Sequence, residues 1–326
     1  MIVNDNLLLF LLLGLVLVGG SLAGTSPQKL MWSVQPLSHV KISSIDTWED
    51  IPDTNLTLTL LNEAPLLISY DFAARAFKPG SSTNDFILDE DMSLGQKDFL
   101  QARVLVDGIP FRQSSSNAQP SSSLEAASRI LRGTVVVNLG AGPHTVQLQW
   151  KKRGTFVTSW NNIPALHDGY SSGRILTATA HHRYMWHTEV SSDDVISVNG
   201  TWVDMKDSFL TFTLVESASL RFLYSMSVKP DYVNPRDEFG LQDDLSARLV
   251  VDGYPYRETG SFTTISSHSY ASAQLSRDIV LDLQAGVHTV KLQWRKWGNY
   301  VRVWRSAPSF LDGYASSRIL AVHGER

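Results

Sequence analysis

The sequence predicts an all-β protein made of two tandem antiparallel β-sandwich domains, jelly-roll-like, after a cleaved signal peptide. Three observations support this prediction. The second half of the chain repeats the first, apolar residues alternate with polar ones, and Asp-Gly pairs separate the alternating segments. Together they indicate one β-sandwich unit that occurs twice.

The repeat is visible in three pairs of segments that keep their order. They are VDGIPFR (106–112) and VDGYPYR (251–257), GPHTVQLQW (142–150) and GVHTVKLQW (286–294), and DGYSSGRIL (168–176) and DGYASSRIL (312–320). The period of about 145 residues is the size of a whole domain. We therefore expect a first sandwich over 24–180 and a second over 181–326. Upstream, Trp48 matches Trp202, and the first copy is longer around 78–96, which predicts an enlarged surface loop.

Within each copy the hydrophobic period is two. Leu56, Leu58 and Leu60 alternate with threonines, as half-buried antiparallel strands do. Asp107-Gly108 and its counterpart are turn signals between such segments. We expect about eight strands per copy, in the first copy near 40–46, 54–61, 66–74, 100–107, 133–139, 143–152, 155–160 and 173–180. A jelly roll fits this count best, and an immunoglobulin-type sandwich, which is nearer 100 residues, is the alternative.

The N-terminus predicts secretion. An apolar run from Leu7 to Val18 is followed by small residues at Ser21 and Ala23, so we expect a signal peptide over 1–23 with cleavage after Ala23. Asp5 precedes the run and no Lys or Arg does, which leaves an uncleaved anchor as the alternative. No later stretch is apolar enough to span a bilayer, so we expect a secreted, extracellular protein without a membrane span after cleavage.

The amino-acid composition excludes several classes of function. The chain has no cysteine, which excludes thiol catalysis, thiolate metal sites and disulfides. Its net charge of −4 argues against a nucleic-acid partner, since such binders are basic. The sequons at Asn55 and Asn199 are candidate glycosylation sites that fit the secretory pathway. We expect no cofactor.

The series VDG-x-P-[FY]-R, AG-x-HTV-x-LQW and DGY-x-S-x-RIL resembles the jelly-roll heads of the tumour-necrosis-factor and complement-type superfamily. Within that superfamily the series is most similar to the globular domain of collagen-triple-helix-repeat-containing proteins. This chain departs from them in having neither a Gly-X-Y stalk nor cysteines. The resemblance implies a head that forms trimers and binds proteins or glycans without being an enzyme.

Several recurring polar residues have a structural and a functional interpretation. His144 and His288 are catalytic candidates by type, but the alternation places each at the start of an inward-facing row, which favours a structural role. Acidic residues at 88–91 and 243–244 could bind calcium, but their low density favours ordinary turn chemistry. Arginines recur at 112 and 257 and at 174 and 318. We prefer pairing with Asp107 or Asp168 inside the fold to recognition of a carboxylate or sulfate.

The hairpin after each LQW segment is the best candidate binding site. Trp150, Trp160, Trp294 and Trp304 are assigned to the core. The candidate binding residues, which combine cations with aromatic rings, are Lys152, Arg153, Arg295, Trp297, Tyr300 and Arg302.

The predicted function is therefore that of a secreted, non-enzymatic interaction protein with no bound metal. It would assemble into a homo-oligomer or bind extracellular proteins or glycans. A lectin-like carbohydrate-binding protein that uses its Trp/Tyr/Arg hairpin loops is the alternative. A hydrolase is the third hypothesis, weakened by the lack of a recognisable nucleophile or carboxylate pair.

Overall fold

The computed structural model describes residues 31–36, 38–77, 98–118, 129–155, 157–162, 173–180, 184–233, 242–266, 273–299, 301–306 and 318–324. Every helix or strand in these ranges is a β-strand, which confirms the predicted all-β class. The expected signal peptide over 1–23 and the acidic cluster at 88–91 lie outside the described residues. No helix in the described ranges is long and apolar enough to cross a membrane.

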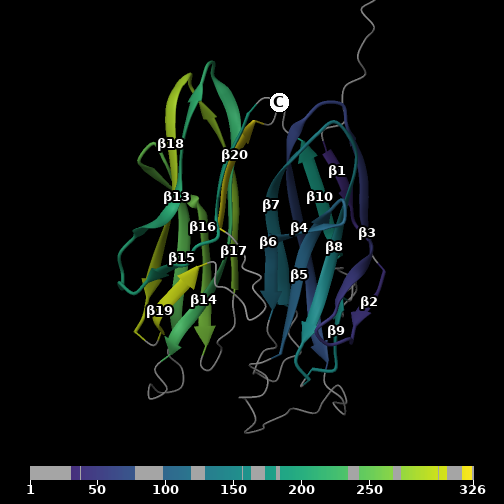
Figure 1. The fold of residues 1–326 in the computed structure, drawn as a ribbon. Helices are drawn as coiled ribbons and strands as arrows, with labels where there is room; N and C mark the ends of the chain where they lie inside the picture. Colours follow the sequence, from purple (N-terminus) through teal and green to yellow (C-terminus); the bar gives the residue numbers. More distant parts are fainter. Residues whose placement is uncertain are drawn as a thin grey trace, which may run out of the picture. The chain divides into compact units, whose positions relative to one another are not determined.

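Each copy contributes ten strands in the described ranges (Figure 1). In the first copy they are β1 (Met31–Val34), β2 (Val40–Ile42), β3 (Trp48–Leu60), β4 (Ala64–Phe77), β5 (Phe99–Val106), β6 (Ile109–Ala118), β7 (Arg129–Leu139), β8 (Gly142–Arg153), β9 (Ser159–Asn162) and β10 (Ile175–Ala180). In the second they are β11 (Met185–Val190), β12 (Asp194–Ile196), β13 (Val203–Leu214), β14 (Ala218–Val233), β15 (Gln242–Val251), β16 (Tyr254–Ser266), β17 (Ala273–Leu283), β18 (Gly286–Trp297), β19 (Val301–Ser306) and β20 (Arg318–Gly324).

The strand order is that of a jelly roll. In the first copy, β10 and β9 pair with successive parts of β4 and so occupy one place in the sheet. β1 and β2 share the next place outward, and β7 lies on the other side of β4. When each broken strand is counted once, the eight places form two sheets in the order 1-8-3-6 and 2-7-4-5, two interlocked Greek keys. The second copy has the same order from β11 to β20.

The Asp-Gly pairs form tight hairpin turns, as predicted. Asp107 and Gly108 connect β5 to β6 with φ angles of 51° and 76°, and Asp252 and Gly253 connect β15 to β16 with 49° and 79°. Two successive positive φ angles define the turn that best matches the twist of paired strands. Asp tolerates this conformation because its short side chain bonds the backbone nearby.

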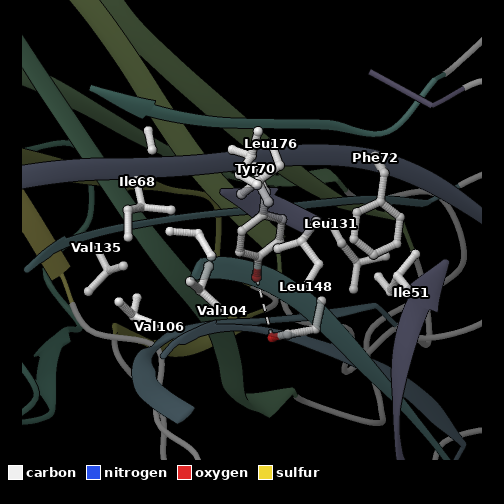
Figure 2. Close-up of a cluster of buried hydrophobic side chains, with 14 of the residues drawn as sticks. Ile51, Ile68, Tyr70, Phe72, Val104, Val106, Leu131, Val135, Leu148 and Leu176 are labelled. Carbon is white, nitrogen blue, oxygen red and sulfur yellow. Dashed lines mark hydrogen bonds between the residues drawn. The ribbon is translucent and has the colours of Figure 1, made fainter. Parts of the chain in front are cut away.

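The core of each sandwich contains a buried tyrosine that joins its two sheets. Tyr70 on β4 lies among Val104, Leu131 and Leu148 (Figure 2). Its hydroxyl donates to the Ser114 carbonyl at 2.7 Å, on β6 of the opposite sheet. Tyr224 makes the equivalent bond to Thr259 at 2.8 Å. Burial raises the pKa of both phenols, so both remain protonated donors at any physiological pH.

The strand prediction missed two strands of the first copy and misplaced the ends of others. Strand β1 was not expected, and β3 begins at Trp48 instead of near residue 54. Strand β6 was not expected, because IPFRQSSSNA shows no alternation of apolar and polar residues. Its Ser114, Ser115 and Ser116 are nevertheless buried, and Ser114 and Ser116 bond Tyr70. The strand expected at 155–160 begins only at Ser159.

Candidate functional site

Arg295 and Trp297 project from the outer face of β18. Residues on this strand alternate strictly, with Val290, Leu292 and Trp294 buried and the residues between them partly exposed. Trp297, at the end of the strand, has 46% of its surface exposed. Trp297 is therefore exposed at the end of the strand, and Arg295 is partly exposed beside it.

Two residues from other strands join them. Trp202 lies just before β13, and Arg248 lies on β15 opposite Gln293 of β18. The guanidinium carbons of Arg248 and Arg295 lie 4.0 Å and 4.6 Å from the centre of the Trp202 ring. The guanidinium carbon of Arg295 also lies 4.8 Å from the Trp297 ring. We call these four residues, Trp202, Arg248, Arg295 and Trp297, the cation–aromatic face.

Hydrogen bonds fix one side of the cation–aromatic face. Arg248 donates from Nε and Nη2 to Gln293 Oε1 at 3.0 and 2.8 Å. Gln293 donates onward to Asp204 at 2.7 Å, and Lys291 donates to the other Asp204 oxygen at 2.8 Å. Burial alone would raise the pKa of Asp204, but these two bonds outweigh it and lower that pKa. The carboxylate is thus committed to Lys291 and Gln293, and neither arginine forms an ion pair with a described residue.

Exposed phenylalanines border the same sheet face. Phe262 on β16 pairs with Ser246 of β15 and is 73% exposed. Phe209 on β13 pairs with Lys291 and is 52% exposed. Paired residues share a face of the sheet, so both rings lie on the side that carries the cation–aromatic face. This surface combines positive charge with exposed aromatic area.

The first copy builds the matching cluster differently. Trp48 takes the place of Trp202, with Arg103 at 4.0 Å and Lys151 at 5.0 Å from its ring. Arg103 bonds Gln149, which bonds Asp50, as in the second copy. However, Arg103 and Lys151 are only 8% and 6% exposed.

The position of Trp297 is taken in the first copy by Arg153. Its guanidinium lies 3.6 Å from Asp46 and 5.6 Å from the Phe99 ring. Arg153 was predicted to bind a ligand, but its charge already faces a carboxylate.

Lys152 was predicted as a binding residue, and the structure contradicts this because its side chain points into the sandwich. Lys152 is 1% exposed, and its Nζ donates to the Gly154 carbonyl at 2.5 Å. Lys296 makes the equivalent bond to Gly298. Burial lowers the pKa of Lys296, and the nearby charge of Asp243 opposes that effect. Both lysines close the hairpin from inside and cannot reach a ligand.

The structure does not bring the other hairpin candidates to this face. Arg302 is exposed on β19, which belongs to the second sheet of the same sandwich. Tyr300 lies outside the described residues.

Both sequon asparagines are exposed. Asn55 lies on β3, and Asn199 precedes β13 and donates to Asn299 at 3.2 Å. Gly200, next to Asn199, lies beside the Trp297 ring, since a Cβ added there would be 3.7 Å from it.

Each recurring histidine connects two turns through hydrogen bonds from both ring nitrogens, and we call this arrangement a histidine clasp. His144 Nδ1 lies 2.7 Å from Asp107 Oδ2, and its Nε2 lies 2.9 Å from the Gly140 carbonyl. His288 repeats this with Asp252 at 2.7 Å and the Gln284 carbonyl at 2.8 Å. Burial alone would lower the pKa of each histidine, but the bonds to Asp and to the carbonyl raise it overall. With both ring nitrogens engaged, neither histidine can accept a proton from a substrate.

The recurring arginines Arg174 and Arg318 are buried, and their partners are mainly neutral oxygens. Arg174 donates to the Ser38 carbonyl at 2.8 Å and to Asn162 Oδ1 at 2.7 Å. Arg318 donates to the Ser192 and Lys206 carbonyls at 2.9 and 2.8 Å. Both arginines therefore act inside the fold, as preferred, but not through Asp107, which bonds His144. Asp168 lies outside the described residues. The side chain of Arg112 lies outside the described residues, and Arg257 is exposed on β16.

No group of three or more metal-binding side chains occurs within the described ranges. Asp243, one of the weaker calcium candidates, is 1% exposed and accepts the Val301 amide beneath the hairpin. Its carboxylate therefore stabilises the hairpin by accepting a backbone hydrogen bond.

The comparisons with known proteins concern the fold. No family model matches the chain, and no curated protein matches it. Among solved structures it is similar to PNGF-II, with 8% identity and a TM-score of 0.34 over 91% of this chain and 65% of that one. It is also similar to PNGase F, a glycosylasparaginase from Flavobacterium meningosepticum, with 9% identity and a TM-score of 0.31 over 91% and 96% of the two chains. A triple-jelly-roll protein of an archaeal virus matches with 10% identity and a TM-score of 0.23 over 90% and 60%. The jelly-roll assignment rests on the strand order itself.

Proposed function

We propose that this protein is a secreted, non-enzymatic binding protein whose contact surface is the cation–aromatic face of the second jelly roll. The observation that carries the proposal is the convergence of Arg248 on β15, Arg295 on β18 and Trp202, which precedes β13, beside the exposed Trp297. Trp and Arg are the residues that most often dominate binding energy at interfaces. The apolar N-terminus and the exposed sequons support an extracellular setting.

The absence of catalysis is supported by how the recurring polar residues are used. The histidines have both nitrogens engaged, and the buried lysines and arginines bond backbone carbonyls. A general base needs a free acceptor within reach of its substrate. The resemblance to tumour-necrosis-factor and complement-type heads points the same way.

The test is an array of extracellular proteins and glycans probed with the secreted chain. We expect at least one saturable ligand that an Arg295→Ala, Trp297→Ala double variant loses. Arg302→Ala is the matched control, since Arg302 is an exposed arginine of the same sandwich on its other sheet. The proposal is overturned if the double variant still binds every ligand of the wild type, or if the purified chain cleaves glycans.

Self-association is a second candidate, supported by the exposed rings of Phe209, Phe262 and Trp297 on one sheet face. Aromatic area of this kind is buried in stable oligomers. Size-exclusion chromatography with light scattering decides it. A monomer at all concentrations contradicts self-association, and a trimer that Phe262→Ser dissociates supports it.

A further inference from the structure

Three arginines gather on the cation–aromatic face and its border without an acidic partner. Arg248 and Arg295 share the Trp202 ring, and Arg257 lies on the neighbouring strand β16. Burial and then the charges of Arg295 and Arg257 lower the pKa of Arg248, so each of these two arginines repels it. Arg248 donates to the neutral Gln293, and no described group accepts a hydrogen bond from Arg295 Nε. Asp244 pairs with Trp297 across the strands, yet it forms no ion pair with a described arginine. This repulsion is relieved when an anion binds.

The aromatic rings hold the arginines in position without using their hydrogen-bond donors. A guanidinium over an indole ring is held by the negative face of the ring. The N–H groups of a guanidinium lie in its own plane, so a ring against its face leaves them available. Arg248 uses Nε and Nη2 for Gln293, and Arg295 Nε is buried, so the Nη groups of Arg295 are the donors left for a ligand. Arg295 lies over both Trp202 and Trp297, so it is ordered before a ligand arrives. An ordered donor loses less entropy on binding than a mobile one.

The same surface offers flat apolar area. Trp297 is 46% exposed and Phe262 is 73% exposed. The weakly positive C–H groups of a pyranose ring suit the negative face of such rings. An extended acidic peptide fits less well, because its alternate carboxylates point away from the sheet.

We propose that the cation–aromatic face binds a sugar chain that carries sulfate groups. The Nη groups of Arg295, with Arg257, would donate to the sulfate oxygens, the charge of Arg248 would attract them, and Trp297 would contact a sugar ring. This inference rests on the proposed function and names its ligand class.

The experiment measures binding of the secreted full chain by calorimetry at roughly physiological salt, where exposed charges are screened beyond about 8 Å. The probes are a heparin octasaccharide, the same octasaccharide after chemical desulfation, and an octapeptide of glutamates. We expect the heparin octasaccharide to bind at least about tenfold more tightly than either of the others, since charge-assisted bonds contribute most. Every variant is also prepared with Asn199→Gln, which removes the sequon nearest to Trp297.

Single substitutions separate charge from ring contact. Arg295→Ala should weaken heparin binding about tenfold, and Arg295→Lys should recover part of that loss. Trp297→Ala should weaken it about fivefold through the lost ring contact. Arg221→Ala is the control, because Arg221 is exposed on the other sheet and paired with Asp278 at 2.7 Å.

Each result has one meaning. Equal binding of the sulfated and desulfated sugars, no heparin binding, or unchanged affinity in Arg295→Ala overturns the sulfated-glycan inference. Tighter binding of the glutamate peptide, lost in Arg295→Ala, overturns the sugar while leaving the proposed contact surface in place. If the array ligands and heparin all bind the Arg295→Ala, Trp297→Ala double variant normally, the proposed function fails as well.

Discussion

The outer faces of the two four-stranded sheets are built from matching residues and differ in exposure. On β13–β18–β15–β16 the arginines beside Trp202 are half-exposed, whereas on β3–β8–β5–β6 Arg103 and Lys151 beside Trp48 are buried. The Asp–Gln–Arg chain of hydrogen bonds is the same in both. The stack of cation on ring is thus part of the shared scaffold, and its accessibility distinguishes the second copy. Where Trp297 stands in the second copy, the first has Arg153.

The largest expected effect concerns the interior, where the two copies should behave alike. Arg174→Ala and Arg318→Ala should each destabilise the protein by about 3 kcal/mol or more, because several buried oxygens lose their donor. Chemical denaturation followed by tryptophan fluorescence measures this. Arg302→Ala, on the surface, should stay within about 0.5 kcal/mol of the wild type. If only one of the two arginine substitutions lowers stability strongly, the interiors of the two copies are not equivalent.

The histidine clasps should give both copies the same pH dependence, of about 1 kcal/mol per clasp. The pKa of His144 and His288 is raised above the usual 6.5, so their contribution to stability is complete below that value. It is lost as the pH rises through the raised pKa. The pKa of Asp107 and Asp252 is lowered from 3.8 despite the opposing effect of burial, because His144 or His288 and a backbone amide bond each carboxylate. Their contribution is present above 3.8 and is lost as the pH falls through the lowered pKa.

Melting temperatures of the wild type and of a His144→Ala, His288→Ala double variant, taken from pH 5 to 9, would measure the clasps. We expect the wild-type advantage to be greatest at the acidic end and to shrink toward the alkaline end. An advantage that grows with pH would contradict protonated clasps.

The smallest effect on stability is expected when Trp297 and Arg153, the residues that differ at one position, are exchanged between the copies. This exchange is the most direct test of the comparison. Trp297→Arg and Arg153→Trp should each change stability by less than about 1 kcal/mol, since both positions are on the surface. Trp297→Arg should lose the ring contact with a sugar, while Arg153→Trp should gain no binding because Lys151 beside it is buried. Binding gained by Arg153→Trp would show that the exposure difference does not decide function.

Much of the fold could be predicted from the sequence, since alternation and Asp-Gly turns are local signals. Strand β6 was missed because a run of serines in the sequence is typical of a loop. In the folded chain these serines are buried, and two of them bond Tyr70 of the opposite sheet. Lys152 was misassigned for a similar reason, because a lysine at a hairpin tip resembles a surface charge until the strand register turns it inward.

The site was predicted in part. Arg295 and Trp297 belong to one hairpin, so sequence alone could pair them. Trp202 and Arg248 join them through the pairing of β18 with its neighbours, and register is a long-range property. One signal was available: Trp48 and Arg103 recur as Trp202 and Arg248 in the second copy.

The pairing of first and last strands determines when each jelly roll can fold during synthesis. β1 pairs with β10, and β11 pairs with β20, so each jelly roll completes its sheet only when its final strand has been synthesised. Such end-to-end pairing folds slowly, because the chain must close a long loop before the contact forms. The strand pairings of the first jelly roll in the described residues all lie within that copy, so its sheets can form while the ribosome is still translating the second.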